Sequence, residues 1–286
     1  MSAPTATLTP ATVRRERPNV TGTRSAFPTL TGRRLALSAH TPRELLVPLL
    51  TPILFALVIA PALASIGPTI PGVDYMSFAA VGTIGLLIPL NCMFAGIGVI
   101  LDRETGARRD LLAAPVSRPL IVFANLAVAL MITALQVVVL VIAAVLRGAD
   151  LNTTAGGFAW FLGAAVLLGI TMYAVAETLA NRIPTVEEYI GAVPAIAIVP
   201  FFFAGSLFPI TALPWALTAF ARLLPLTHAL ALMRYGLLDH NASGLHDIWG
   251  RSNATTMAAL SLAVVASYAA GFTAIALRTF RKSVES

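Results

Sequence analysis

The sequence predicts an all-α, polytopic membrane protein with six transmembrane helices, and composition is the first observation behind this prediction. Hydrophobic residues make up 57% of the 286 residues, whereas only 11% are charged. A soluble domain of this composition would have too little polar surface to cover itself. The second observation is that six runs are long and apolar enough to cross about 30 Å of hydrocarbon. These runs are approximately Leu45–Leu63, Met76–Val99, Pro119–Leu146, Phe158–Ala180, Tyr189–Phe208 and Met257–Leu277.

The distribution of Lys and Arg predicts how these spans are oriented. If the chain crosses six times, 15 of its 19 Lys and Arg residues fall on the side that carries both termini. Short loops rich in Lys and Arg remain on the cytoplasmic side of a membrane. We therefore expect a multi-pass protein of the cell inner (cytoplasmic) membrane with both termini in the cytoplasm. The net charge of +6 then needs no nucleic-acid partner to explain it.

The segment before the first span divides into two parts. Residues 1–31 are rich in Thr, Pro, Ala and Arg without an apolar period, so we expect a disordered cytoplasmic arm ahead of a membrane domain over residues 32–286. Leucines and charged residues mix from Arg33 to Leu46, which predicts a short helix in the membrane interface, interrupted by Pro42. Arg33-Arg34 before an apolar run also resembles a twin-arginine leader, but five more spans follow it.

The segment between the fifth and sixth spans, Pro209–Thr256, differs from the other connections. It contains two apolar pieces, Leu213–Leu224 and Thr227–Leu238, which are separated by Pro225. Each piece is too short to cross the membrane. We therefore expect two short helices that dip into the outer leaflet or lie on it.

The connection between the second and third spans, Leu101–Arg118, carries seven charges in 18 residues. After Gly106, the stretch Ala107–Ala114 predicts about two helical turns, which Pro115 ends. Leu111 and Leu112 would be apolar knobs among charges, which suits insertion into a groove of a partner protein. The alternative is an ordinary loop whose arginines only fix the topology.

The order of residues in two stretches, Asp102–Arg118 and Phe203–Arg234, resembles type-2 ABC exporter permeases of the multidrug and daunorubicin-resistance kind. In this family an acidic-basic-acidic-Gly segment leads into Leu-x-x-x-Pro-x-x-Arg, and the second stretch lies after the fifth span. The first stretch matches at Asp102, Arg103, Glu104, Gly106, Leu111, Leu112, Pro115 and Arg118. The second matches at Phe203–Pro209, Leu213–Trp215, Leu224–His228 and Arg234. Two departures are the reversed order of Thr105 and Gly106, and Leu224 before Pro225 where the family commonly has Asn.

The resemblance covers about Arg33 to the C-terminus. It implies a permease that pairs with a second copy or a related permease and carries a separate ABC ATPase subunit on its cytoplasmic face. The loop would be the coupling helix, for which Glu104, Arg108, Leu111 and Leu112 are the main candidates. ATP and Mg would be bound by the partner subunit.

The motifs in the sequence also indicate a transport subunit rather than an enzyme. A P-loop requires Gly-x-x-x-x-Gly-Lys-Ser/Thr, and the one lysine, Lys282, lies in the tail. His240 and His246 lack a third ligand at a metal-binding spacing, so we expect no metal site. A membrane-embedded enzyme and a membrane scaffold without transport remain as alternatives.

The mainly apolar spans and the short outer segment favour export of an amphipathic small molecule, such as a drug or antibiotic. The alternative is a polysaccharide or lipid-linked glycan. In the dimer of this family, the second and fifth spans line the space between subunits. This implies a substrate pathway along Asn91, Phe94, Phe201, Phe202 and Phe203. The other interpretation is that these side chains only pack against the core or face lipid.

Two further features concern the interior of the spans. Glu177 near the end of the fourth span could belong to a proton or substrate relay, or could be an interfacial acid that reaches water, with Arg182 as a possible partner. Glycines in the second span predict close approach of neighbouring helices. They are Gly82, Gly85, Gly96 and Gly98.

Overall fold

A computed structural model describes most of the chain, and every regular element in the described residues is helical. The described residues are 23–39, 50, 53–54, 57–58, 62, 74–114, 116–151, 153–238 and 242–285. Most of the expected first span, Leu45–Leu63, and most of the expected disordered arm therefore lie outside them. Five helical segments within them are long and apolar enough to cross a membrane, or six if one bent pair of helices counts as a span.

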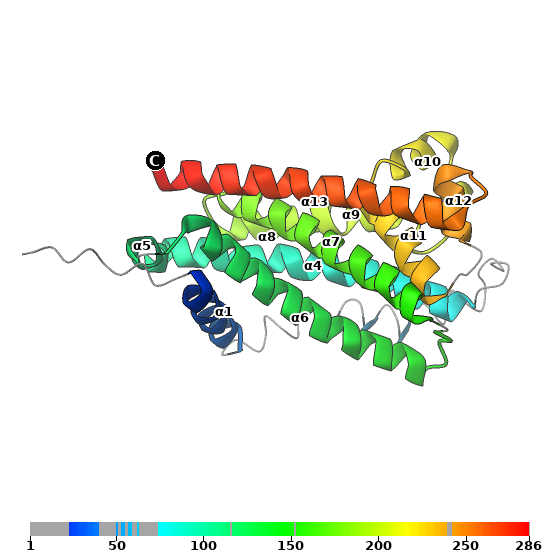
Figure 1. Ribbon diagram of the computed structural model, residues 1–286, viewed down its shortest axis with the longest axis horizontal. Coiled ribbons are helices and arrows are strands. Elements are labelled where there is room, and N and C mark those ends of the chain that lie inside the picture. Colours follow the sequence, from blue (N-terminus) through cyan, green and yellow to red (C-terminus); the bar gives the residue numbers. More distant parts are fainter. Residues whose placement is uncertain are drawn as a thin grey trace, which may run out of the picture.

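Four long helices run along the long axis of the molecule (Figure 1). They are α4 (Tyr75–Glu104), α6 (Arg118–Leu146), α7 (Ala155–Ala180) and α13 (Ala254–Glu285). Helix α7 packs against both α4 and α13, and α4 also packs against α6. In the most apolar part of α4, 72% of the residues are buried, against 22% for α13. Helix α4 is therefore the central element, whereas α13 lies at the periphery.

The remaining long span is built from α8 (Val186–Ala197) and α9 (Val199–Phe203). Helix α8 begins with a cap in which the Thr185 hydroxyl accepts from the Glu188 amide at 3.3 Å. The helix breaks at Ile198, between Pro194 and Pro200, since proline removes a helical hydrogen bond. The expected spans from the second to the sixth are thus confirmed. The fifth ends at Phe203 rather than at Phe208, because Gly205 adopts a left-handed conformation with φ of 80°.

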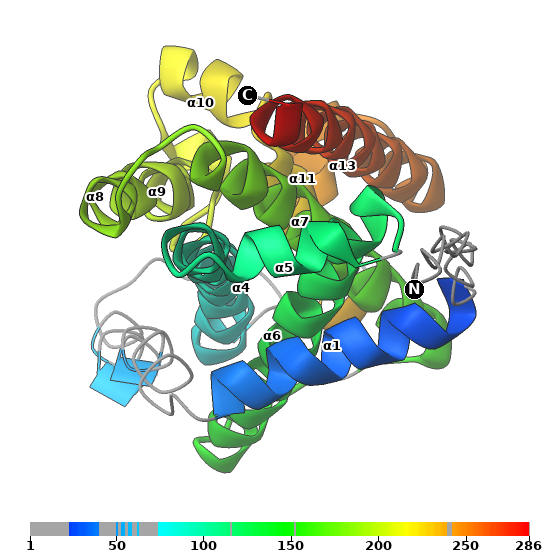
Figure 2. The same ribbon diagram turned by 90° about the vertical axis from the view of Figure 1, so that its left-hand side faces the viewer.

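Helix α1 (Thr23–Ala39) lies across one end of the bundle and packs against α6 (Figure 2). It corrects the expected boundaries, because the helix begins at Thr23 instead of Arg33, and residues 23–31 are helical rather than disordered. Ala26 is buried, and Leu30, one turn later, packs against the main core. Contacts with the bundle thus stabilise a segment whose local composition gave no sign of a helix.

In its described residues, the connection from α9 to α13 forms three short helices and one 3₁₀ turn. They are η2 (Ile210–Ala212), α10 (Trp215–Ala221), α11 (Pro225–Leu237) and α12 (Ser243–Trp249). The two expected short helices are confirmed as α10 and α11, which meet at a bend of 80°. Helix α11 is mostly buried and packs against α7 and α13, so it belongs to the bundle. Helix α12 was not expected.

Arg234 on α11 is a buried charge that sequence analysis had counted with the outer loops. Its guanidinium donates to the carbonyl oxygens of Gly205 at 2.6 Å and Ser206 at 2.8 Å. The guanidinium carbon also lies 3.4 Å from the centroid of the Phe78 ring. Arg234 therefore connects α11 to the end of α9 and to the beginning of α4.

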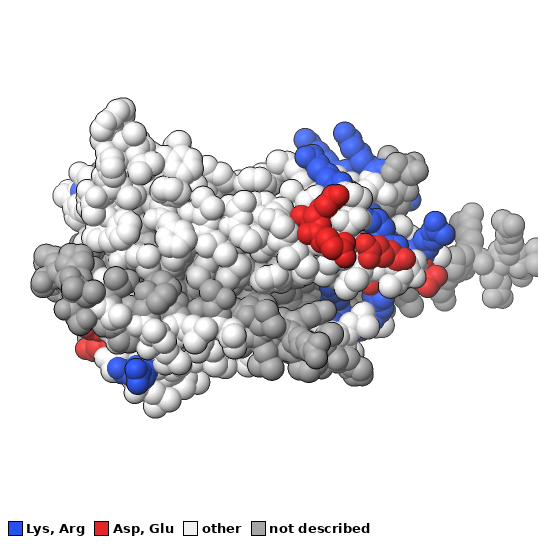
Figure 3. All heavy atoms as spheres, turned by 180° about the vertical axis from the view of Figure 1, so that it is seen from behind, with Lys and Arg blue, Asp and Glu red and all other residues white. Residues whose placement is uncertain are grey.

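On the face shown in Figure 3, charged side chains gather at the end of the molecule that carries α1 and the C-terminus, and the described surface between the two ends is almost free of them. We call this end, formed by α1, the α4–α6 connection, the α7–α8 turn and the last turns of α13, the charged end. A bundle with an uncharged band between polar ends is the shape that a bilayer requires.

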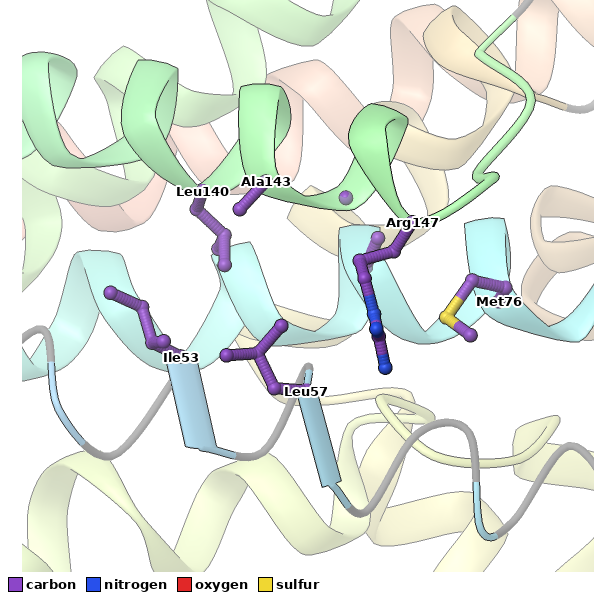
Figure 4. Close-up of a pocket in the computed structure, with 8 residues that line it drawn as sticks. Ile53, Leu57, Met76, Leu140, Ala143 and Arg147 are labelled. Atoms are coloured by element: carbon purple, nitrogen blue, oxygen red, sulfur yellow. The ribbon is translucent and has the colours of Figure 1, made fainter.

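Part of the expected first span can be placed beside the bundle. Ile53 and Leu57 line a pocket with Met76 of α4 and Leu140 of α6 (Figure 4). The side chain of Arg147 extends between Leu57 and Met76 in this view. The pocket has a volume of only about 10 Å³, so it is a packing defect rather than a ligand site.

All four glycines of the second span lie against another element, as predicted. An added Cβ would meet the Ser206 carbonyl at Gly82, Leu230 at Gly85, the Tyr189 hydroxyl at Gly96 and the Arg34 guanidinium at Gly98. A fifth close approach joins Gly157 of α7 to Gly236 of α11, where each Cβ would meet the carbonyl oxygen of the other glycine. Both groups there are backbone, so neither can move aside like a side chain.

We expect Gly236→Ala to destabilise the protein, because the new methyl group would push α7 and α11 apart. Overpacking of this kind costs about 1–3 kcal/mol. Gly271→Ala on α13 is the matched control, since a Cβ there meets nothing within 4 Å. The measurement is the Tm of the detergent-solubilised variants, followed by size-exclusion chromatography after heating. Equal Tm values for the two variants would contradict the close contact.

Candidate functional site

The connection between α4 and α6 folds into a short helix, α5 (Ala107–Ala113), as the sequence predicted. Gly106 precedes it with φ of 80°, a left-handed conformation that favours glycine. Helices α5 and α1 both lie across the end of the bundle (Figure 2). The predicted stop signal, Pro115, lies outside the described residues. Arg118 is exposed at the first position of α6.

Asp102, in the last turn of α4, pairs with two arginines of α1. Its carboxylate lies 3.5 Å from Arg33 and 3.4 Å from Arg34. Arg34 also donates to the carbonyl oxygens of Ala95 and Gly98, at 3.5 and 3.3 Å. The absence of a side chain at Gly98 leaves space for this guanidinium. Asp102 therefore joins the connection to α1.

Arg103 contacts the turn between α7 and α8. It donates to the carbonyl oxygen of Ala180 at 3.0 Å and to those of Ile183 and Pro184 at 2.7 Å each. These carbonyls follow the C-terminus of α7, where the helix dipole favours a cation. Arg103 therefore joins the end of α4 to α7.

Arg108 connects α5 to α13. It donates to the Ser283 hydroxyl at 2.6 Å, and its guanidinium carbon lies 5.0 Å from the centroid of the Phe280 ring. Partial burial lowers the pKa of Arg108, and the opposing effect of the Glu177 carboxylate raises it. The Ser283 hydroxyl donates in turn to the Asn181 side-chain oxygen at 2.9 Å.

The hydrogen bonds continue from Asn181 into the interior of α7. Asn181 donates to one carboxylate oxygen of Glu177 at 2.8 Å, and the Tyr173 hydroxyl donates to the other at 2.9 Å. Five residues thus form a continuous series, which we call the Arg108–Tyr173 chain: Arg108, Ser283, Asn181, Glu177 and Tyr173.

The environment of Glu177 corrects one sequence-based interpretation. Glu177 is 1% exposed, so it is not an interfacial acid that reaches water. Its hydrogen-bond partners lie four residues before and four residues after it on α7, and the exposed Arg182 forms no ion pair with it in the described residues. The spacing of Tyr173, Glu177 and Asn181 on one helix face was a signal that could have revealed this cluster. Ser283 gave no such signal.

The two leucines of α5 have a different position from the one expected. Leu111 and Leu112 are half-buried and pack against the core of their own bundle, so they are not free knobs. The residues of this connection that face outward include Glu104, Arg109 and Asp110, which are all exposed. The outward surface is therefore charged, and the apolar side chains hold α5 in place.

The residues expected along a substrate pathway have unequal positions. Asn91 is buried on α4, and its amide nitrogen has no hydrogen-bond partner among the described residues. Phe201 is 1% exposed and packs edge-on against Phe202, which is 50% exposed. Phe94 is half-buried against the core, and Phe203 packs edge-on against the Phe220 ring. Of these five residues, only Phe202 is exposed on the outside of the bundle.

We expect Arg103→Ala to destabilise the protein, because three carbonyl oxygens would lose a charged donor. Hydrogen bonds to charged groups contribute about 1.5–3 kcal/mol. Arg109→Ala removes the same side chain from an exposed position nearby and should leave the Tm unchanged. Thermal unfolding in detergent measures both variants, and an equal loss in the two would show that Arg103 is not a structural contact.

Comparison with known proteins adds one match. A family model described as ABC-2 type transporter matches residues 25–238 of the chain, which include α1, the α4–α6 connection and α11. No curated protein matches the chain.

Proposed function

The chain belongs to the ABC-2 type transporter family, as a multi-pass permease component, and from this premise we propose that it is the membrane subunit of an ATP-driven exporter. The observation that carries the proposal is the position of α5, a short helix with a charged outward surface at the charged end. A separate ATPase subunit would bind there, and it would hold the ATP and Mg. The sequence itself has no P-loop, because its one lysine, Lys282, lies outside any Gly-x-x-x-x-Gly-Lys-Ser/Thr pattern.

The charged end faces the cytoplasm in this proposal. Support comes from the excess of Lys and Arg on that side of the membrane and from the uncharged band that separates the two ends (Figure 3). The protein would then lie in the cell inner membrane with both termini in the cytoplasm. Helix α5 would also face the cytoplasm, where ATP is available.

Contact with the ATPase would be made by the exposed charges Glu104, Arg109 and Asp110. Charged groups at the edge of an interface chiefly set orientation and the rate of association. Transmission would then use the buried side of the connection. A displacement of α5 would act directly on α13 through Arg108, and a displacement of the adjoining end of α4 would act on α1 through Asp102 and on α7 through Arg103. These helices would have two arrangements, in which the substrate site opens to opposite sides of the membrane. Closure of the ATPase would shift the equilibrium between the two arrangements.

A second permease would pack against the bundle to complete the pathway. The outer face of α8 and α9 is apolar, with Ile190, Val199 and Phe202 each 45–50% exposed. Such a face requires lipid or another protein. We propose that this face, with Phe202, borders the space between two permeases, whether these are identical or related.

The proposed substrate is an amphipathic small molecule, such as a drug or antibiotic. The apolar character of the exposed α8–α9 face supports this choice, and so does the short connection from α9 to α13, which forms only short helices in the described residues. The test is export of a fluorescent anthracycline from cells that express the chain with the ATPase that co-purifies from its native membranes. Export of lipid-linked saccharide without export of the anthracycline would contradict the proposal.

We expect the double variant Arg109→Glu, Asp110→Arg to weaken assembly with the ATPase by about tenfold, because each reversal removes an attraction and adds a repulsion. Arg251→Glu, an exposed reversal outside the charged end, is the control and should assemble normally. The measurement is the amount of ATPase retained on the immobilised permease across a salt series. Equal retention by the double variant and the control would place the ATPase elsewhere.

We expect the double variant Leu111→Asp, Leu112→Asp to have a different defect. The two carboxylates cannot remain half-buried against the core, so α5 would detach from the bundle while its exposed charges stay available. ATP hydrolysis should continue, whereas transport should fall by at least about tenfold. Hydrolysis and transport are measured on the same reconstituted vesicles. Unchanged transport would refute the role of α5 in transmission.

A further inference from the structure

A basic groove at the charged end has no role in the function proposed above. It lies between the α7–α8 turn and the last turns of α13 and has a volume of about 730 Å³. Four of its lining residues are basic: Arg182, Arg278, Arg281 and Lys282. The lining residues include no Asp or Glu, and none of the four cations forms an ion pair within the described residues. Four cations along one groove, with no acidic residue in its lining, favour an anionic ligand.

The position of the groove along the membrane normal indicates which anion would reach it. The apolar part of the last span ends at Leu277, and Arg278 follows directly. At 1.5 Å per residue, the cations from Arg278 to Lys282 lie about 1.5–7.5 Å beyond that point. This is the layer of the lipid headgroups, which separates about 30 Å of hydrocarbon from water. Ile275 lines the same groove and supplies an apolar wall on the membrane side.

The groove also contacts the hydrogen bonds that lead to α5. Asn181 and Ser283 line it, and these two residues are the links between Arg108 and Glu177 in the Arg108–Tyr173 chain. An anion in the groove would therefore lie beside the residues that hold α5 to α13. Its charge would draw the α7–α8 turn and the end of α13 together, because each contributes cations.

We propose that this groove binds the phosphate headgroup of an anionic phospholipid from the adjacent leaflet, and that the bound lipid fixes the position of α5. The first half of the proposal concerns binding alone. The second half, in which the bound lipid would regulate transport through α5, rests on the proposed function. An acidic segment of the ATPase would suit the charge equally, but a groove at headgroup depth favours a lipid.

Native mass spectrometry of the full-length chain in neutral detergent tests the binding. The probes are phosphatidylglycerol and phosphatidylcholine, which differ in headgroup charge. The variant is Arg278→Gln, Arg281→Gln, Lys282→Gln, and the control is Arg14→Gln, Arg15→Gln, Arg17→Gln, which removes as many positive charges from the N-terminal residues. We expect the wild type and the control to retain phosphatidylglycerol on the order of 100-fold more strongly than the variant does.

Three results would overturn the binding proposal. The first is equal retention of the two lipids by the wild type, and the second is undiminished retention of phosphatidylglycerol by the groove variant. The third is displacement of the lipid by millimolar inorganic phosphate, which would identify a soluble anion as the ligand. If instead only an ATPase subunit protects the groove from chemical modification of Lys282, the occupant is the acidic segment of that protein.

A second measurement tests the link to α5 without requiring any ATPase. Ala113→Cys on α5 is exposed, and the native Cys92 is fully buried, so an environment-sensitive fluorophore labels α5 selectively. In nanodiscs, addition of phosphatidylglycerol to phosphatidylcholine should shift the emission. The shift should disappear in Asn181→Ala, Ser283→Ala, while lipid retention persists. No shift in the wild type would refute the link. Because no partner is present, the outcome is independent of whether the proposed ATPase exists.

Discussion

Hydrocarbon offers no hydrogen bonds, so a charged or strongly polar group inside a membrane bundle must find its partners within the protein. Two buried charges show how this chain meets the requirement. Arg234 directs its guanidinium at the carbonyl oxygens of Gly205 and Ser206, where a left-handed glycine has ended the helix and exposed them. Glu177 receives hydrogen bonds from Tyr173 and Asn181 on its own helix. The Arg234 pairing fixes the position of α11 relative to the end of α9, whereas the Glu177 pairing satisfies the carboxyl group within α7 and its C-cap.

The same requirement explains why the α4–α6 connection is held firmly despite its many charges. Asp102, Arg103 and Arg108 have partners on α1, on the α7–α8 turn and on α13, respectively. A loop that merely fixed topology would need positive charge but no specific partners. Contacts to three separate parts of the bundle instead fix the end of α4 and, through Arg108, α5, whereas the outward charges Glu104, Arg109 and Asp110 are exposed. In the proposed function, the outward residues would serve assembly with the ATPase and the inward residues would serve transmission.

The parts of the fold that could be predicted have local signals. The spans follow from apolar length, and α5 follows from a glycine and a proline on either side of a short helical stretch. The contacts at the charged end join residues that are far apart in sequence: Arg34 and Asp102 are separated by 68 residues, and Arg108 and Ser283 by 175. No periodicity reveals such pairs. For the same reason the start of α1 was placed too late, and Leu111 and Leu112 were assigned to a partner when their own core was available to bury them.

The contact between Gly157 and Gly236 has a consequence for motion. Near the end of the bundle away from α5, the backbones of α7 and α11 approach so closely that there is no room for a side chain between them. At the other end, side chains hold α7, both by apolar packing of Ala176 and Ala180 and by the hydrogen bonds of Arg103 and Asn181. The backbone contact fixes α7 at one end, whereas side-chain contacts at the other end can rearrange. A helix held in this way can tilt about its fixed end. We expect α7 to tilt about the glycine pair as a fulcrum rather than slide along its axis, so that a small displacement at α5 becomes a rotation of the whole helix.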